Sequence, residues 1–449
     1  MAAAIDFIGQ VFDTLAKTLN ITQTPNQVMQ MAWPGITISP ADFKPAANPT
    51  GPYSADVARE QFSMLADMAP ALDKLRYINS GYEISDLYEA LISSAIPAGA
   101  THDTVTANPL YQMFSNAIYD FITMKRGTMD DPNVFYHAST ATPANWYDES
   151  AAQFWPEISI SSTASQSAST PSIFTTLGGK AALAGTLFRL KPKAALPITM
   201  PATTISQGLP GVKPLNNTLL KAATASGMKS ATMSTLVSSN LMQKDVFVAN
   251  LNAGRKEALF SKTAVPFKAT KTAASKAGAL TNIKVMPDFT FQGTKRLTLD
   301  ERLLVGNIAF DKLPARQESS TSSGFSIRFK YCRVNIERPW LNLTLLSLKN
   351  WYISGSGAGE YSTGSLDNNP GMFPLLPTSF IVVKDLSITA NWSASDKTTI
   401  QDAVSFGPFD VRNGSWNSNT LTIPGMQIIC WISRLMPMLA PAAGNIPAP

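Results

Sequence analysis

The stretch Gly324–Trp340, which reads GFSIRFKYCRVNIERPW, decides how the fold of this chain is interpreted. From Phe325 to Tyr331 the odd-numbered positions are apolar and the even-numbered ones polar, the period of a strand with one buried face. From Cys332 onward the even-numbered positions are apolar. One extra residue turns over all later side chains of a strand, so we predict a β-bulge or sharp bend at Tyr331–Cys332. Pro339 lacks a backbone N–H and should end the strand.

A second strand pattern covers Phe380–Trp392, and we expect it to pair with the first strand at the centre of a sheet. The apolar side chains predicted to share one face are Phe380, Val382, Leu386, Ile388, Ala390 and Trp392. Further strand patterns cover 341–353 and 421–432, separated by turn-rich loops. Residues 289–291 and 297–310 also fit strands or a hairpin, with a short helix over 299–308 as the alternative. We therefore predict an antiparallel, β-sandwich-like domain over residues 286–437.

The first third of the chain has helical periodicity instead. Apolar residues recur at helical spacing over 4–20, 54–78, 84–96 and 109–126, with Ser54 and Asn108 as N-caps. Between the first two of these, Trp33–Tyr53 holds five prolines and no period, which predicts an extended connection. The aromatic cluster Trp146, Tyr147, Phe154 and Trp155 should seat the helices on the next unit. We predict an acidic helical domain over residues 1–157.

The middle of the chain, residues 158–285, is rich in Ser, Thr, Ala and Lys and has no strong period. So long a stretch without periodicity is atypical of a compact domain, and we predict a basic arm or extended region that is ordered by packing against something else. The last residues, 438–449, should form a flexible tail. The predicted fold class is therefore α+β, with a helical N-terminal domain, an irregular middle and a β-rich C-terminal domain.

The net charge of +5 conceals a strong asymmetry along the chain. Residues 1–150 carry 7 Lys/Arg and 16 Asp/Glu, whereas residues 151–290 carry 15 and 4. We expect the two blocks to meet, within one chain or between copies, and the basic strand face of Arg328, Lys330 and Arg333 to contact the acidic third. The basic block lacks interleaved aromatic residues, so nucleic acid would bind it only non-specifically.

Residues typical of catalysis or phosphate binding are scarce. The chain has two histidines, His102 and His137, for which we expect structural roles. Leu177–Lys180, reading LGGK, departs from a phosphate-binding loop because Ala181 stands where Ser or Thr would hold magnesium. The glycine-rich run Gly355–Gly359 is followed by more loop and not by a helix, which favours a flexible or ligand-facing loop.

The remaining candidate residues are no more specific. Asp130–Asp131 and Asp148–Glu149 are adjacent in sequence, and adjacent side chains rarely face one another as an acid–base pair does. Ser226 and Lys229 match a Ser–Lys pair without its companion motifs. Cys332 and Cys430 lie in apolar runs and should be free core residues. We therefore predict no catalytic residues, no metal site and no cofactor.

The sequence carries no targeting signal that we can identify. The first residues lack the basic start of a secretory signal, and the longest apolar run, at 424–440, is interrupted by polar residues and proline. We expect synthesis in the cytoplasm, with lysis or unconventional export as open routes of release. The predicted function is that of a non-enzymatic structural or interaction protein, a homo-oligomer or one with a protein partner and without an evident small-molecule substrate. The alternative is a membrane-active protein of the pore-forming type.

Overall fold

The computed structural model describes most of the chain outside its basic middle. The described residues are 2–100, 104–129, 131–162, 172–183, 187–191, 196–198, 283–285, 298–310 and 322–442. Most of the predicted arm, 158–285, therefore lies outside the described residues. The same holds for His102, Asp130, Ser226, Lys229 and most of the predicted tail, 438–449.

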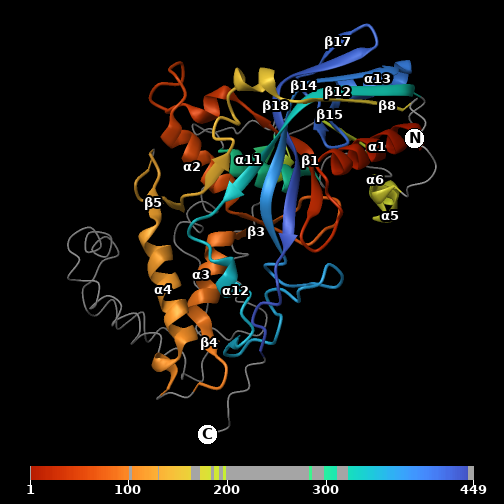
Figure 1. The fold of residues 1–449 in the computed structure, drawn as a ribbon. Helices are drawn as coiled ribbons and strands as arrows, with labels where there is room; N and C mark the ends of the chain where they lie inside the picture. Colours follow the sequence, from red (N-terminus) through yellow and green to blue (C-terminus); the bar gives the residue numbers. More distant parts are fainter. Residues whose placement is uncertain are drawn as a thin grey trace.

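A seven-stranded antiparallel sheet forms the centre of the molecule (Figure 1). Its long strands, in spatial order, are β1 (Val28–Ile38), β18 (Thr420–Leu435), β14 (Leu375–Asn391) and β12 (Ser323–Glu337). The short strands β17 (Ser415–Asn417), β7 (Thr140–Thr142) and β8 (Glu157–Ser161) pair at the two sides. The predicted pairing of the two strand patterns is confirmed, as is the α+β fold class.

The prediction that β12 holds an extra residue at Tyr331–Cys332 is wrong, because the extra residue lies in β14. While β12 advances from Arg328 to Lys330, β14 runs from Ser387 back to Lys384, so the additional residue belongs to β14. The apolar positions of β12 change parity because its two halves are buried on opposite faces. Its odd positions as far as Phe329 join one hydrophobic core, and its even positions from Cys332 join the other.

The prediction of one shared apolar face for Phe380–Trp392 is also wrong. Phe380 and Val382 lie in the core beneath α2 (Ala55–Ala66), whereas Leu386 and Ile388 lie in the core beneath α1 (Ala2–Thr18). The irregularity at Asp385, whose φ is 56°, reverses the side-chain alternation between these two halves.

The prediction of an extended connection over Trp33–Tyr53 is wrong at its start, because residues 33–38 belong to strand β1. This strand pairs with β18 on both sides of an irregularity between Met31 and Ile36, so that Pro34 falls in the interruption and no ladder donor is lost there. Both β1 and β7 come from the predicted helical segment 1–157, and they complete the same sheet as the strands of 286–437.

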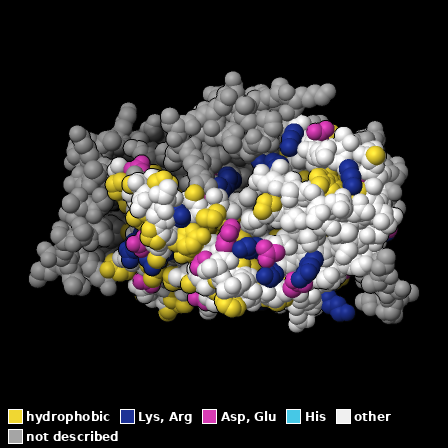
Figure 2. All heavy atoms as spheres, turned by 90° about the horizontal axis from the view of Figure 1, so that it is seen from above, with side chains coloured by type: hydrophobic (Ala, Val, Ile, Leu, Met, Phe, Trp, Pro, Cys, Tyr) yellow, Lys and Arg dark blue, Asp and Glu magenta, His cyan; other side chains and the backbone are white. Residues whose placement is uncertain are grey.

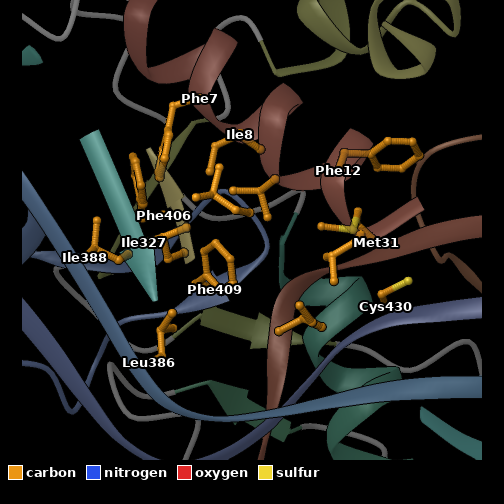
Figure 3. Close-up of a cluster of buried hydrophobic side chains, with 14 of the residues drawn as sticks. Phe7, Ile8, Phe12, Met31, Ile327, Leu386, Ile388, Phe406, Phe409 and Cys430 are labelled. Carbon is orange, nitrogen blue, oxygen red and sulfur yellow. The ribbon is translucent and has the colours of Figure 1, made fainter. Parts of the chain in front are cut away.

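One face of the sheet is covered by α1 and by a second, smaller sheet. The small sheet consists of β9 (Phe188–Leu190), β15 (Ala403–Phe406) and β16 (Phe409–Asp410). Phe7 of α1 stacks on Phe325 of β12 with ring centroids 5.2 Å apart. Phe7 and Ile8 lie in the same buried cluster as Ile327, Phe406 and Phe409 (Figure 3). Short helices α5 (Ile173–Thr176) and α6 (Gly179–Leu183) and helix α13 (Ala394–Gln401) lie at the margin of this core.

The opposite face is covered by α2 and α11 (Leu299–Phe310). The preferred prediction of strands or a hairpin over 289–291 and 297–310 is therefore wrong where the structure describes it, and the helical alternative is correct. Trp146 is buried between Phe62 of α2 and Phe380 of β14, as expected for a side chain that seats the helices. The turns η1 (Pro40–Phe43) and η3 (Ala151–Phe154) flank this core.

A helical lobe extends from one end of the sheet (Figure 1). Its elements are β2 (Met68–Pro70), β3 (Asn79–Glu83), α3 (Ile84–Ser94), β4 (Ala95–Pro97), η2 (Val105–Ala107), α4 (Pro109–Thr123), β5 (Lys125–Gly127), β6 (Phe135–His137), α12 (Leu343–Leu346) and β13 (Trp351–Ile353). The predicted helix to residue 126 ends earlier, at Thr123, because Lys125–Gly127 pair with β6. No helix within the described ranges is both long and apolar enough to cross a bilayer.

The described ends of the middle segment also pair with each other. Strand β10 (Leu196–Ile198) runs antiparallel to β11 (Ile283–Val285), which places residues 196–198 beside residues 283–285.

Candidate functional site: a buried carboxylate cluster

A group of ionisable side chains is buried where the helical lobe meets the sheet. It contains the carboxyl groups of Asp67, Glu83, Asp86 and Glu89, together with Lys125 and His137. Asp67 directly follows α2, and Glu83 is the N-cap position of α3. Lys125 and His137 are register partners in the β5–β6 hairpin. Three elements thus bring together residues from a span of more than seventy positions.

Asp67 ties the end of α2 to the beginning of α3. Its carboxylate accepts hydrogen bonds from the backbone N–H of Ser85 at 2.7 Å and from the Ser85 hydroxyl at 2.5 Å. The backbone N–H of Ile84 donates to the Asp67 carbonyl at 2.6 Å. N–H groups at a helix N-terminus lack intrahelical acceptors, so the Asp67 carboxylate satisfies one of these donors of α3.

Arg338 supplies the positive charge nearest to Asp67. It follows the last residue of β12, and its guanidinium donates to the carbonyl of Pro377 at 2.7 Å and to that of Ala66 at 2.5 Å. The side chain therefore joins α2 to the ends of two central strands. Burial lowers the pKa of Arg338 to about 10, although the Asp67 carboxylate acts in the opposite direction. Such a buried cation is tolerated because carbonyl and carboxylate oxygens surround it.

The carboxyl groups of Asp67, Asp86 and Glu89 hold protons more strongly than carboxyl groups in water. Burial, followed by the charge of Glu83, raises the pKa of Asp67 to about 7, although the two Ser85 hydrogen bonds lower it. Burial and then Glu83, Asp67 and Glu89 raise the pKa of Asp86 to about 8. Burial also raises the pKa of Glu89, against the effect of Lys125. The cause common to all three is desolvation of the charged form.

His137 is buried and neutral beside this cluster. Its ring stacks on Phe121 with centroids 3.9 Å apart, and its Nε2 lies 3.2 Å from the Phe121 carbonyl, to which it donates. Burial, and then the charge of Lys125, lower the pKa of His137 to about 4. The imidazole thus takes part in aromatic packing that also includes Trp340, at 5.4 Å.

The chemistry open to this cluster is limited by space. Two carboxyl groups with different proton affinities are the basis of general acid–base catalysis. However, the cavity that they line encloses only about 20 Å³, which is room for about one water molecule. Within the part of the chain that the structure describes, no three His, Cys, Asp or Glu residues form a group suited to a metal ion. The arrangement can bind and release protons and can hold the lobe on the sheet.

Of the predicted candidates, only His137 lies at this cluster. Lys180 of the LGGK stretch pairs with Asp6 of α1 at 2.6 Å. A Cβ on Gly179 would lie 2.5 Å from the Phe174 ring, which explains the glycine through packing. The predicted pair Asp148–Glu149 is divided, since Asp148 accepts from the Ser150 N–H while Glu149 pairs with Lys384.

The other predicted features serve the framework of the fold. In the glycine-rich loop, the Gly359 N–H donates to the Ala440 carbonyl at 3.1 Å and so holds the C-terminal segment. Cys332 and Cys430 are buried and free, as expected. They are not on adjacent strands, because β14 lies between β12 and β18.

Sequence reasoning missed the carboxylate cluster, although one signal for it was present. Glu83, Asp86 and Glu89 are spaced by three, which places them on one side of α3. A row of acidic residues on a helix is normally solvated, so spacing alone did not indicate burial. Asp67 and Arg338 gave no signal of their own, because only the packing of α2 against β12 and β14 brings them together.

Comparison with known proteins finds no relative of this chain. Neither the protein-family profiles, nor the curated protein sequences, nor the solved structures contain a match to this chain.

Proposed function

We propose that this chain is a non-enzymatic structural or interaction protein that assembles with further copies of itself through complementary acidic and basic groups. The observation that carries this proposal is the position of Phe154. Its side chain is 81 % exposed, while its neighbour Trp155 packs against the hydrophobic core under α2. A large aromatic side chain held out from a rigid core is typical of an interface anchor.

The surface beside Phe154 carries both signs of charge. We call it the charged seam and define it as Glu149, Glu157, Arg328, Lys330, Lys384 and Asp385. Its ion pairs are Arg328–Glu157 at 2.6 Å, Lys330–Asp385 at 3.2 Å and Lys384–Glu149 at 3.8 Å. Arg328, from the predicted basic strand face, pairs with Glu157, which lies just beyond the acidic block 1–150. Elsewhere too, basic and acidic side chains lie interleaved on the molecular surface (Figure 2).

A surface with both signs suits contact between identical copies. In a two-fold interface the same patch faces itself, so each positive group must find a negative group on the same patch. The Arg328–Glu157 pair is exposed, with 65 % and 37 % of its side chains accessible, and exposed ion pairs contribute little to stability, so this pair can exchange its partner within one chain for a partner across an interface at little cost. The apolar contribution would then come from Phe154.

Size-exclusion chromatography with light scattering tests the proposal on the full-length protein. We expect a species larger than the monomer at low salt, with partial dissociation at high salt because exposed charges are screened. Phe154→Ser should shift the equilibrium towards monomer. Met113→Ser is the control, because Met113 is also exposed, at 44 %, but lies on α4, away from the seam.

Two results would contradict assembly through this surface. One is a monomer at every salt and protein concentration, and the other is equal behaviour of the Phe154→Ser and Met113→Ser variants. The same samples, added to dye-loaded liposomes, test the pore-forming alternative, which requires leakage of the dye. Ordered oligomers with intact liposomes would favour the structural role.

A further inference from the structure

A cavity of about 580 Å³ opens between four separate parts of the chain. Trp33 of β1 contributes one wall, and residues 72–76, between β2 and β3, contribute the second. Leu177 and Ala182, around α5 and α6, form the third, and residues 366–368 form the fourth. Residues 366–368 belong to the loop that follows the glycine-rich run Gly355–Gly359, and Leu177 is the first residue of the LGGK stretch. Its volume lies within the range of about 300–1,000 Å³ that is usual for small-molecule sites.

Apolar and polar residues line different parts of the cavity. Its apolar walls are formed by Trp33, Leu72, Leu75, Leu177 and Leu366. Trp33 and Leu75 are buried, and Leu72 and Leu366 pack against the small apolar cluster that includes Leu375. Such walls favour an aliphatic or aromatic ligand body, because they gain most when apolar surface leaves water.

The polar groups lie together on the 72–76 and 366–368 segments. Asp73 is committed to the loop itself, since its carboxylate accepts from the backbone N–H groups of Leu75 at 2.8 Å and Arg76 at 2.7 Å. Lys74 forms an ion pair with Asp367, and this pair joins the two segments. The Asp367 side chain is 83 % exposed and that of Lys74 is 39 % exposed. An exposed pair of this kind is easily opened, so another anion can compete for the lysine.

We propose that this cavity binds a single-chain amphiphile with an anionic head, of the class of fatty-acid carboxylates. The aliphatic chain lies against the leucine and tryptophan walls. The carboxylate takes the place of Asp367 as partner of Lys74, with the second cation, Arg76, also lining the cavity. A cationic head would have to displace Lys74, which is 39 % exposed, and would then face Arg76, whereas an anionic head displaces Asp367, which is 83 % exposed.

The first test compares ligands by isothermal titration calorimetry on the full-length protein. The probes are dodecanoate, dodecyltrimethylammonium, which has the same chain with a cationic head, and acetate, which has the head alone. We expect saturable binding of dodecanoate, binding at least about tenfold weaker for the cationic amphiphile, and none for acetate, because a charge-assisted contact contributes about 1.5–3 kcal/mol. Equal binding of both amphiphiles, or no saturable binding of dodecanoate, would overturn the proposal.

The second test uses the two members of the ion pair, for which the proposal predicts effects of opposite sign. Lys74→Ala should weaken dodecanoate binding by about tenfold, because the head group loses its cation. Asp367→Ala should strengthen it by about two- to fivefold, because the competing carboxylate is gone. If the pair only held the loops together, both substitutions would weaken binding, and that result would overturn the proposal.

Two further variants complete the design. Leu366→Arg places a charge in the apolar wall and should abolish binding, while Lys397→Ala, at a half-buried lysine that contacts Trp416 and does not line the cavity, should leave it unchanged. Thermal unfolding shows whether each variant is folded. Should Leu366→Arg fail to fold, the opposite effects at Lys74 and Asp367 still decide, since both side chains lie at the surface. If none of these variants changed dodecanoate binding, the ligand would bind elsewhere, and the assignment of binding to this cavity would be refuted.

Discussion

Asp67 accepts two hydrogen bonds from Ser85, one from the backbone N–H at 2.7 Å and one from the hydroxyl at 2.5 Å, in a region where both residues are buried. This relationship joins α2 to α3 and so attaches the helical lobe to the helix that covers the central sheet. A substitution that removes the Ser85 hydroxyl keeps the backbone hydrogen bond, so it measures the contribution of the hydroxyl alone.

Above the raised pKa of Asp67, where its carboxyl group is charged, Ser85→Ala should therefore destabilise the protein by about 1.5–3 kcal/mol, the usual cost of losing a hydrogen bond to a charged group. Urea unfolding followed by circular dichroism measures the change. The control is Ser347→Ala, because Ser347 is exposed and donates only to the Leu343 carbonyl of its own short helix. An equal and small effect of both substitutions would show that the Asp67–Ser85 bond does not secure the lobe.

The carboxylate cluster should make stability fall as the pH rises. Folding raises the pKa of Asp67 to about 7 and that of Asp86 to about 8, so the folded chain holds protons that the unfolded chain releases. The resulting stability is complete below the unfolded pKa of a carboxyl group and is lost as the pH rises towards 8. We expect the melting temperature to fall by about 5 °C between about pH 6 and about pH 9. Asp86→Asn should reduce this slope, whereas Asp402→Asn, at an exposed residue after α13, should not.

His137 should produce the opposite dependence at lower pH. Burial lowers its pKa to about 4, so the unfolded chain binds a proton that the folded chain does not, and the associated stability is lost as the pH falls from about 6.5 towards 4. His137→Phe should abolish this acid-side loss while keeping the stacking on Phe121 and Trp340. Thermal melts between about pH 4 and about pH 7 would show it, and an unchanged acid-side slope in the variant would contradict the assignment to His137.

Arg338 should be far less tolerant of substitution than an exposed arginine. Arg338→Met leaves the carbonyls of Ala66 and Pro377 without this donor and the Asp67 carboxylate without its nearest cation, for which we expect a loss of about 3–5 kcal/mol. Arg126→Met is the matched control, because Arg126 is exposed on β5. Denaturant unfolding compares the two, and a difference below about 1 kcal/mol would count against a structural role for Arg338.

The irregularity of β14 can be tested at Asp385. Its φ of 56° suits Asn or Gly and opposes a β-branched side chain, so Asp385→Val should cost about 1–3 kcal/mol while Asp385→Asn should cost little. Thr389→Val, at an exposed position of the same strand, provides the control for adding valine to a regular strand. Equal effects at both positions would mean that Asp385 does not adopt the left-handed conformation in solution.

Local patterns were sufficient where each element depends on its own residues. Ser54 caps α2 and Asn108 caps α4 through hydrogen bonds to backbone N–H groups of the first turn, as their sequence positions indicate. Pro339 follows the end of β12 after one further residue. These features follow from propensity and capping within a few residues, which the sequence displays directly.

Patterns failed where burial came from distant partners. The parity change in β12 results from two different cores on opposite faces, and an alternating pattern cannot distinguish this from a bulge. Likewise β1 lies in a proline-rich stretch without visible periodicity, yet β18 supplies its register partners from the other end of the chain.

The sequence by itself determined the α+β class, the pairing of Gly324–Trp340 with Phe380–Trp392 and the helices α1 to α4, because these elements show clear local periodicity. Only the tertiary structure decided that Asp67, Asp86 and His137 share one buried site, and that Trp33, Lys74 and Asp367 line one cavity. The reason is that the pKa of a charged side chain and the burial of an apolar one depend on the groups packed around them in the folded chain. Those groups are distant in sequence, so local patterns do not reveal them.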